Sequence, residues 1–176
     1  MLTPLDAPPA LLTCGFSGKM HSKFRVFQRS DADFVKRIIL QLDNLLQGSN
    51  GVMLPPATEL KQLTAYSQDA FYRVIMTNAN FLSTILKVMH AFPYHAVVQA
   101  SCTMTAANLC IGNNFNLNTL LRDGFVSLML NALRLHHLSW EVKSASAQAV
   151  CLLRALDPTF LQRIIKQETD GAVLLE

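Results

Sequence analysis

Charged residues are scarce in this chain. Of its 176 residues, 15% are Asp, Glu, Lys or Arg and 51% are hydrophobic, whereas about a quarter of a typical soluble domain is charged. The net charge of +3 is small, which does not favour binding to nucleic acid or to a membrane. The surplus of apolar residues predicts that some apolar surface faces a partner. One basic cluster is interpreted as a solvated surface: Lys19, His21, Lys23, Arg25 and Arg29.

Cysteine patterns that hold metals or disulfide frameworks are absent. The four cysteines, Cys14, Cys102, Cys110 and Cys151, form no C-x-x-C pair, and the sequence contains no N-x-[ST] acceptor. This usage argues against a zinc site and against a secreted disulfide scaffold. We expect all four thiols to be reduced and structural, with Cys102 and Cys151 buried on long helices. A reducing compartment follows, the cytoplasm first and the nucleus as the alternative.

No stretch of the sequence is suited to cross a membrane. The longest run without Asp, Glu, Lys or Arg, from Val88 to Leu121, contains His90, Pro93 and His95, so it is a poor fit to a lipid-spanning helix. The N-terminal residues have no basic segment before their short apolar run, which argues against a signal or transit peptide. Residues 1–30 are predicted to be an extended, proline-containing leader.

Motifs of catalysis are also missing. The sequence has no paired carboxylates at a catalytic spacing, no glycine-rich phosphate loop and no serine elbow. His136 and His137 lack a third ligand nearby, and the end of a helix explains them without a metal. We therefore predict no catalytic residue, no metal and no cofactor, and a protein that is not an enzyme.

One phrase recurs along the chain. It reads ADFVKRIILQLDN from Ala32, ANFLSTILKVMHA from Ala79 and DGFVSLMLNAL from Asp123. The anchors Phe34, Phe81 and Phe125 are 47 residues (34 to 81) and 44 residues (81 to 125) apart, and each opens an apolar pattern at helical spacing. A fourth copy, DGAVLLE, begins at residue 170. Four copies in register indicate an internal repeat of the length found in helical arrays.

The segments between the anchors repeat as well. After each of the second and third phrases comes a long helical pattern rich in small residues, at 95–112 and 139–156. Shorter helical patterns precede the phrases, at 67–80, 116–124 and 158–171, and Ser67 or Asp69 is expected to cap the first of these. No alternation of period two is long enough for a strand. The unit is therefore a short helix, a helix and a long helix, and the fold class is an all-α solenoid.

The long helical patterns resemble the third helix of armadillo repeats. In that family the helix reads Val-Gln-x-x-Ala-x-Trp-Ala-Leu-x-Asn-Leu, and VQASCTMTAANLC matches it at Val98, Gln99, Asn108 and Leu109. The phrase DGFVSLMLNAL resembles the armadillo second helix, and EVKSASAQAVCLL from Glu141 is a looser third helix.

The resemblance covers about residues 30–176. It implies a right-handed α-solenoid of about three armadillo-like three-helix repeats plus the start of a fourth. The implied repeat domain is 31–176, with repeats at about 31–66, 67–112 and 113–157 and a partial one at 158–176. The segment QGSNGVMLPPAT (47–58) is interpreted as a loop within the first repeat.

In the armadillo family the third helices line a concave groove. The resemblance implies that the groove residues here are Ser101, Met104, Asn108, Ala145, Gln148 and Leu152. In the importin-α members of the family, Trp and Asn clamp an extended basic peptide. Met104 and Gln148 stand at the Trp positions here, which argues against a nuclear-import receptor. Asn108 either bonds the backbone of a bound peptide or ties a neighbouring loop within the solenoid, and Met104 contacts either a partner or the core.

Two functional classes follow from this pattern. The first is a protein-interaction adaptor or scaffold that binds a protein or peptide partner in the groove, with Asn108 at the centre of the site. The second is a packing subunit of a larger assembly, buried through its ends and sides. The incomplete fourth repeat adds an expectation of self-association, or of continuation of the solenoid, through the C-terminal face.

Overall fold

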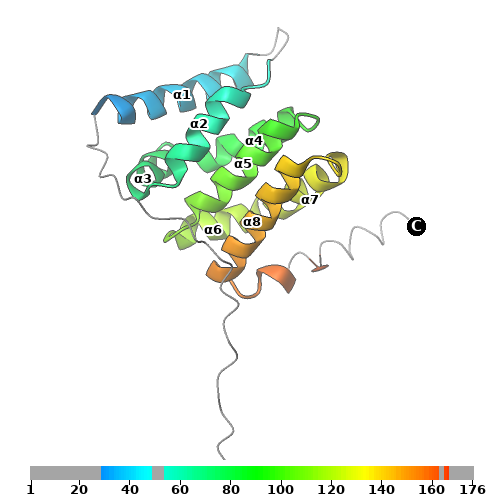
Figure 1. Ribbon diagram of the computed structural model, residues 1–176. Coiled ribbons are helices and arrows are strands. Elements are labelled where there is room, and N and C mark those ends of the chain that lie inside the picture. Colours follow the sequence, from blue (N-terminus) through cyan, green and yellow to red (C-terminus); the bar gives the residue numbers. More distant parts are fainter. Residues whose placement is uncertain (1–28, 49–53, 163–164, 167–176) are drawn as a thin grey trace, which may run out of the picture.

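The computed structural model describes residues 29–48, 54–162 and 165–166 (Figure 1). Residues 1–28 of the predicted leader at 1–30 and the fourth copy of the phrase at 170–176 therefore lie outside the described residues, and residues 29 and 30 begin a helix. Every regular element within them is a helix, which confirms the predicted all-α class. No described helix is both long enough and apolar enough to span a membrane. The helices are α1 (Arg29–Gln47), α2 (Ala57–Ser67), α3 (Ala70–Asn78), α4 (Phe81–Ala91), α5 (Ala96–Leu109), α6 (Asn114–Arg122), α7 (Phe125–Leu135) and α8 (Trp140–Leu156).

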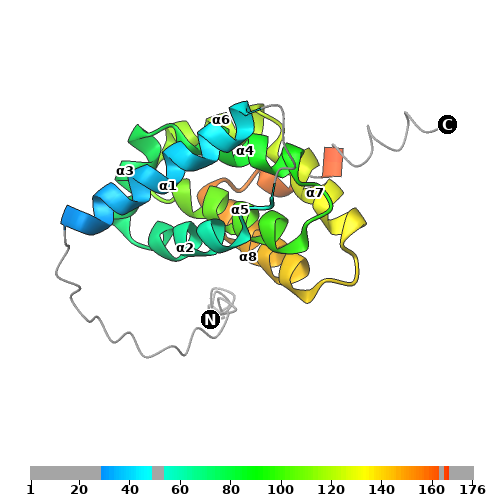
Figure 2. The same cartoon turned by 90° about the horizontal axis from the view of Figure 1, so that it is seen from above.

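The helices form two layers. In the first layer α2, α5 and α8 lie side by side, with α5 in contact with both of its neighbours (Figure 1). Helices α1, α4 and α7 follow one another in the second layer, and the view from above separates α2, α5 and α8 from α1, α4 and α6 (Figure 2). The order of short helix, helix and long helix occurs twice, as α3–α4–α5 and as α6–α7–α8.

The repeated phrase marks the same backbone turn in two places. Phe81 and Phe125 are the first residues of α4 and α7, and both side chains are fully buried. The residue before each has a left-handed backbone, with φ of 53° at Asn80 and 84° at Gly124. Glycine adopts this conformation without strain, and asparagine tolerates it better than most residues. This requirement explains why Asn80 and Gly124 stand directly before the two phenylalanines.

The start of α3 is capped by a side chain. The Asp69 carboxylate accepts a hydrogen bond of 2.8 Å from the backbone N–H of Phe71, which satisfies one of the donors that a helix start leaves free. Of the two residues that the sequence offered for this cap, Asp69 is the one used. Ser67 is instead the last residue of α2, where its hydroxyl donates to the carbonyl of Thr64.

Pro93 and Gln99 together end α4. Proline has no N–H, so Pro93 cannot donate to the carbonyl of Met89 one turn earlier. The buried amide of Gln99 donates to that carbonyl at 2.8 Å and to the carbonyl of Phe92 at 3.0 Å. The side chain of Gln99 thus replaces the missing backbone donor and ties α5 to the end of α4.

The expected burial of Cys151 is wrong. Cys102 and Cys110 are buried, whereas Cys151 is exposed on α8. Helix α5, which carries Cys102, has helices on both sides within its layer, and α8 has only α5 beside it in the described part of the chain. The small-residue pattern predicted close packing on α8 correctly only for the side that faces α5.

Candidate partner-binding groove

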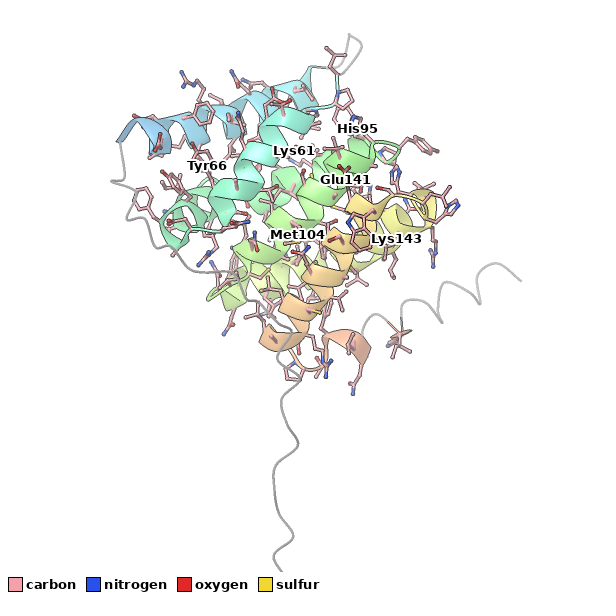
Figure 3. The ribbon with its side chains drawn as sticks, viewed as in Figure 1. Lys61, Tyr66, His95, Met104, Glu141 and Lys143 are labelled. Atoms are coloured by element: carbon pink, nitrogen blue, oxygen red, sulfur yellow. The ribbon has the colours of Figure 1, made fainter. Side chains whose placement is uncertain are left out.

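An open groove of about 320 Å³ crosses α2, α5 and α8. Figure 3 shows three of its residues, Lys61, Met104 and Glu141, which come from the three helices in that order. We call it the α2/α5/α8 groove, and its lining residues are Lys61, Thr64, Val97, Ala100, Ser101, Met104, Trp140, Glu141, Ser144, Ala145 and Gln148.

Small side chains line the α5 part of the groove. Ala100 and Ser101 are buried at this position, and Met104 is half-buried. Ala145 of α8 is 4% exposed and belongs to the same small apolar cluster as Ala100. Because alanine and serine extend little beyond the helix backbone, they leave room for another chain to approach.

The α2 side is positioned by one hydroxyl. Thr64 Oγ1 donates to the carbonyl of Leu60 in its own helix at 2.8 Å. The same oxygen lies 3.2 Å from the carbonyl oxygen of Ser101 and 2.9 Å from Thr105 Oγ1, both on α5. These contacts fix the position of α2 along α5, and with it the position of Lys61 one turn before Thr64.

The α8 side carries a large exposed aromatic residue. Trp140 is 78% exposed although it lines the groove. It is the first residue of α8, following the N-cap Ser139. Ser139 accepts a 3.4 Å hydrogen bond from the N–H of Val142, which begins the helix and turns Trp140 and Glu141 outward.

More apolar surface lies beside Trp140. Tyr94 is 82% exposed and Leu138 is 85% exposed, in the loops that precede α5 and α8. The Nε2 atom of His136 lies 2.8 Å from the carbonyl oxygen of Pro93, and since a carbonyl only accepts, Nε2 carries the hydrogen. This bond holds together the two loops, which carry the exposed Tyr94 and Leu138.

The groove residues expected from the sequence fall into two groups. Ser101, Met104, Ala145 and Gln148 line the groove, and Gln148 is exposed on α8, where its amide donates to Ser144 Oγ at 3.0 Å. Asn108 and Leu152 lie outside the lining.

Asn108 has a partner within the chain. Its side chain is 6% exposed, and its amide nitrogen donates to Ser67 Oγ of α2 at 2.9 Å. The sequence allowed two roles for Asn108, a hydrogen bond to a neighbouring segment of the chain or a hydrogen bond to a bound peptide. The hydrogen bond within the chain is present, and it joins Asn108 to the end of α2.

The groove carries one charge of each sign among its described lining residues, Lys61 on α2 and Glu141 on α8. Both side chains are exposed, and neither is within ion-pair distance of a described residue. The described ion pair is a local one, between Arg122 and Asp123, with its atoms 2.7 Å apart.

The described residues give little support for chemistry at a thiol or a metal. Burial raises the pKa of the Cys102 thiol far above its ordinary value and that of Cys110 to about 12, so neither forms the reactive thiolate at neutral pH. Among the described residues, no group of three His, Cys, Asp or Glu side chains is arranged to hold a metal ion.

Several residues that line the groove on α2 and at the start of α8 were not predicted from the sequence. Lys61 and Thr64 lie in α2, whose sequence does not repeat the pattern of the other long helices clearly. Trp140 and Glu141 fall within the long helical pattern at 139–156, but they were not predicted to line the groove. A signal was present for the second pair, since Ser139 is a strong N-cap residue and its position predicts a helix starting at residue 140.

Comparison of the chain with protein-family models, with curated proteins and with solved structures gives no match.

Proposed function

We propose that this chain is a non-catalytic protein-interaction module whose helices form an armadillo-like solenoid, and that it binds a protein or peptide segment in the α2/α5/α8 groove. The observation that carries the proposal is the combination of a small-residue surface on α5 with Trp140, 78% exposed, on α8. Exposing a tryptophan to water is unfavourable, and tryptophan is among the residues that most often dominate binding energy at protein interfaces.

Binding in such a groove requires no chemical step. A segment in extended conformation would cover Trp140 and Met104 with its apolar side chains. Its backbone would find hydrogen-bonding groups in Ser144 and the exposed amide of Gln148. The polar contacts of Thr64 with α5 set the position of α2 in advance, which lowers the entropy cost of binding.

Selection of peptides from a displayed random library on the whole chain tests this function. Binding of the selected peptides should fall by about 30-fold in Trp140→Ala, since a hot-spot residue contributes about 2 kcal/mol or more. Met104→Glu should also abolish binding by placing a charge in the groove. Phe115→Ala is the matched control, because Phe115 is 75% exposed on α6, away from the groove. Equal loss in Phe115→Ala, or no loss in Trp140→Ala, contradicts the proposal.

A second candidate is a packing subunit, and the outer side of α8 favours it. Ala147, Cys151 and Ala155 recur every fourth residue on α8, and all three are exposed. Small residues at this spacing allow another helix to approach closely. Light scattering over a range of concentrations, with Ala147→Glu as the variant and Lys87→Glu on α4, away from α8, as the control, separates the two functions. Self-association that Ala147→Glu abolishes would favour packing.

A further inference from the structure

The charges of the α2/α5/α8 groove indicate what kind of segment fits it. Lys61 belongs to α2 and Glu141 to α8, so α5 lies between them. Figure 3 shows both side chains on the face formed by these three helices. Neither has an ion-pair partner among the described residues. A bound segment therefore meets a cation on one side of the groove and an anion on the other.

The spacing of the two charges follows from helix packing. Neighbouring helices pack with their axes about 8–10 Å apart, and Lys61 and Glu141 are two helices apart. The axes of α2 and α8 are thus about 16–20 Å apart. An extended chain advances about 3.3 Å per residue, so the complementary charges on a ligand that crosses α5 from one of these helices to the other are about five to six residues apart.

The side chains beside each charge add a preference. Trp140 adjoins Glu141, and a guanidinium or ammonium group can stack on the indole while it pairs with the carboxylate. Thr64 adjoins Lys61, one helical turn away. Ala100, Ser101 and Met104 lie between the two ends, where a small or medium apolar side chain of the ligand would fit.

We propose that the ligand of this groove is a dipolar extended peptide segment. It carries an acidic residue at Lys61, a basic residue at Glu141 and Trp140, and an apolar residue over Met104, with the two charges about five to six residues apart. This proposal rests on the proposed function and specifies its ligand by charge order and spacing.

A panel of dye-labelled synthetic peptides tests the proposal by fluorescence anisotropy. Each peptide has one Asp, one Arg and a central Leu in a Ser/Ala host, with the two charges two to nine residues apart and in both orders. The intact chain should prefer one order and an intermediate spacing, and its binding should weaken as salt is raised. The double variant Lys61→Glu with Glu141→Lys should prefer the opposite order, with the affinity for the original peptide lowered about tenfold.

Matched charge reversals control for effects of net charge. Lys87→Glu on α4 and Asp33→Lys on α1 reverse exposed charges outside the groove, so this double variant should keep the original order. Reversal of the preferred order only in the groove variant supports the proposal. If peptides bind and lose affinity in Trp140→Ala but are indifferent to the charges at 61 and 141, the dipolar ligand is wrong and the groove function stands. If no peptide shows binding that depends on Trp140, both fail.

Discussion

Helix α5 is packed in different ways on its two sides. Toward α2 the contact is polar: the Thr64 hydroxyl lies within hydrogen-bond distance of the Ser101 carbonyl and the Thr105 hydroxyl, and Asn108 donates to Ser67. Toward α8, α5 packs closely without any hydrogen bond between the two helices in the described part of the chain. We call these contacts the α2/α5 interface and the α5/α8 interface.

The difference shows how one helix can be both positioned and closely packed. Hydrogen bonds are directional, so the α2/α5 interface fixes the position of α2 along α5. Alanine permits close approach without dictating a position, and the α5/α8 interface, with Ala100 and Ala145 in one cluster, gains its stability from packing. The groove spans both interfaces, so the first sets where Lys61 lies and the second sets how far Trp140 stands from α5.

Thiol labelling should show the largest contrast between the flanked helix and the outer one. Cys102 on α5 is fully buried and Cys151 on α8 is exposed. We expect a maleimide to modify Cys151 about 10³-fold or more faster than Cys102, because Cys102 reacts only when the fold opens. Peptide mapping by mass spectrometry after timed labelling measures the two rates separately. Comparable rates in native buffer would show that α5 is not flanked on both sides as described.

Overpacking the α5/α8 interface should give the largest change in stability. Ala149 on α8 is fully buried and lies outside the groove lining, so Ala149→Leu introduces a side chain with no space to occupy. The free energy of unfolding should fall by about 1–3 kcal/mol, as measured by urea denaturation. Ala147→Leu is the control on the exposed side of the same helix, where a change within about 0.5 kcal/mol is expected. A tolerated Ala149→Leu would mean that α8 can move away from its neighbours.

The two interfaces also explain which parts of the fold could be predicted from the sequence and which could not. The helices were predictable because Phe81 and Phe125 open the same apolar pattern, and because Asp69 and Pro93 mark a start and an end. The partner of Asn108 was not predictable, because it depends on the position of α2, forty-one residues earlier in sequence. Local periodicity identifies which side of a helix is buried, but it does not identify the side chain on the opposing helix.

Exposure on α8 was misjudged for a related reason. A stripe of small residues has the same sequence pattern whether another helix covers it or not. On α5 the small residues at Ala106 and Ala107 are fully buried, whereas on α8 Ala147 and Cys151 are exposed. The pattern predicts that a helix can be packed closely, and the number of neighbours decides whether it is. Ser101, Met104, Ala145 and Gln148 line the α2/α5/α8 groove, and their role in binding stays a prediction.

Removing the tie at the α2/α5 interface should have an intermediate effect. Asn108→Ala deletes the donor to Ser67 and should lower the free energy of unfolding by about 1–2 kcal/mol. A double-mutant cycle with Ser67→Ala isolates the pair, for which a coupling of about 0.5–1.5 kcal/mol is expected. Gln148→Ala serves as the control, because Gln148 is exposed and bonds only within α8. Additive effects of Asn108→Ala and Ser67→Ala would show that the bond does not stabilise the interface.

The smallest expected change compares two threonines on α5 itself. Thr103 and Thr105 are both fully buried, but the Thr103 hydroxyl has no hydrogen-bond partner among the described residues, whereas that of Thr105 bonds Ser101 and lies 2.9 Å from that of Thr64. Valine has nearly the shape of threonine without the hydroxyl. Thr103→Val removes a buried hydroxyl that makes no hydrogen bond to a described residue. The free energy of unfolding should therefore be unchanged or slightly higher.

Thr105→Val instead removes a bonded hydroxyl and deprives Thr64 of one partner, so it should lower the free energy of unfolding by about 1 kcal/mol. Urea denaturation of the two variants under one set of conditions gives the difference directly, and nearly identical slopes with urea are expected because the exposed area on unfolding hardly changes. A loss in Thr103→Val as large as in Thr105→Val would mean that the Thr103 hydroxyl has a partner in solution, such as a buried water. Hydrogen bonding on α5 would then not be confined to the α2/α5 interface. The contrast between the α2/α5 and α5/α8 interfaces would be smaller than the described contacts indicate.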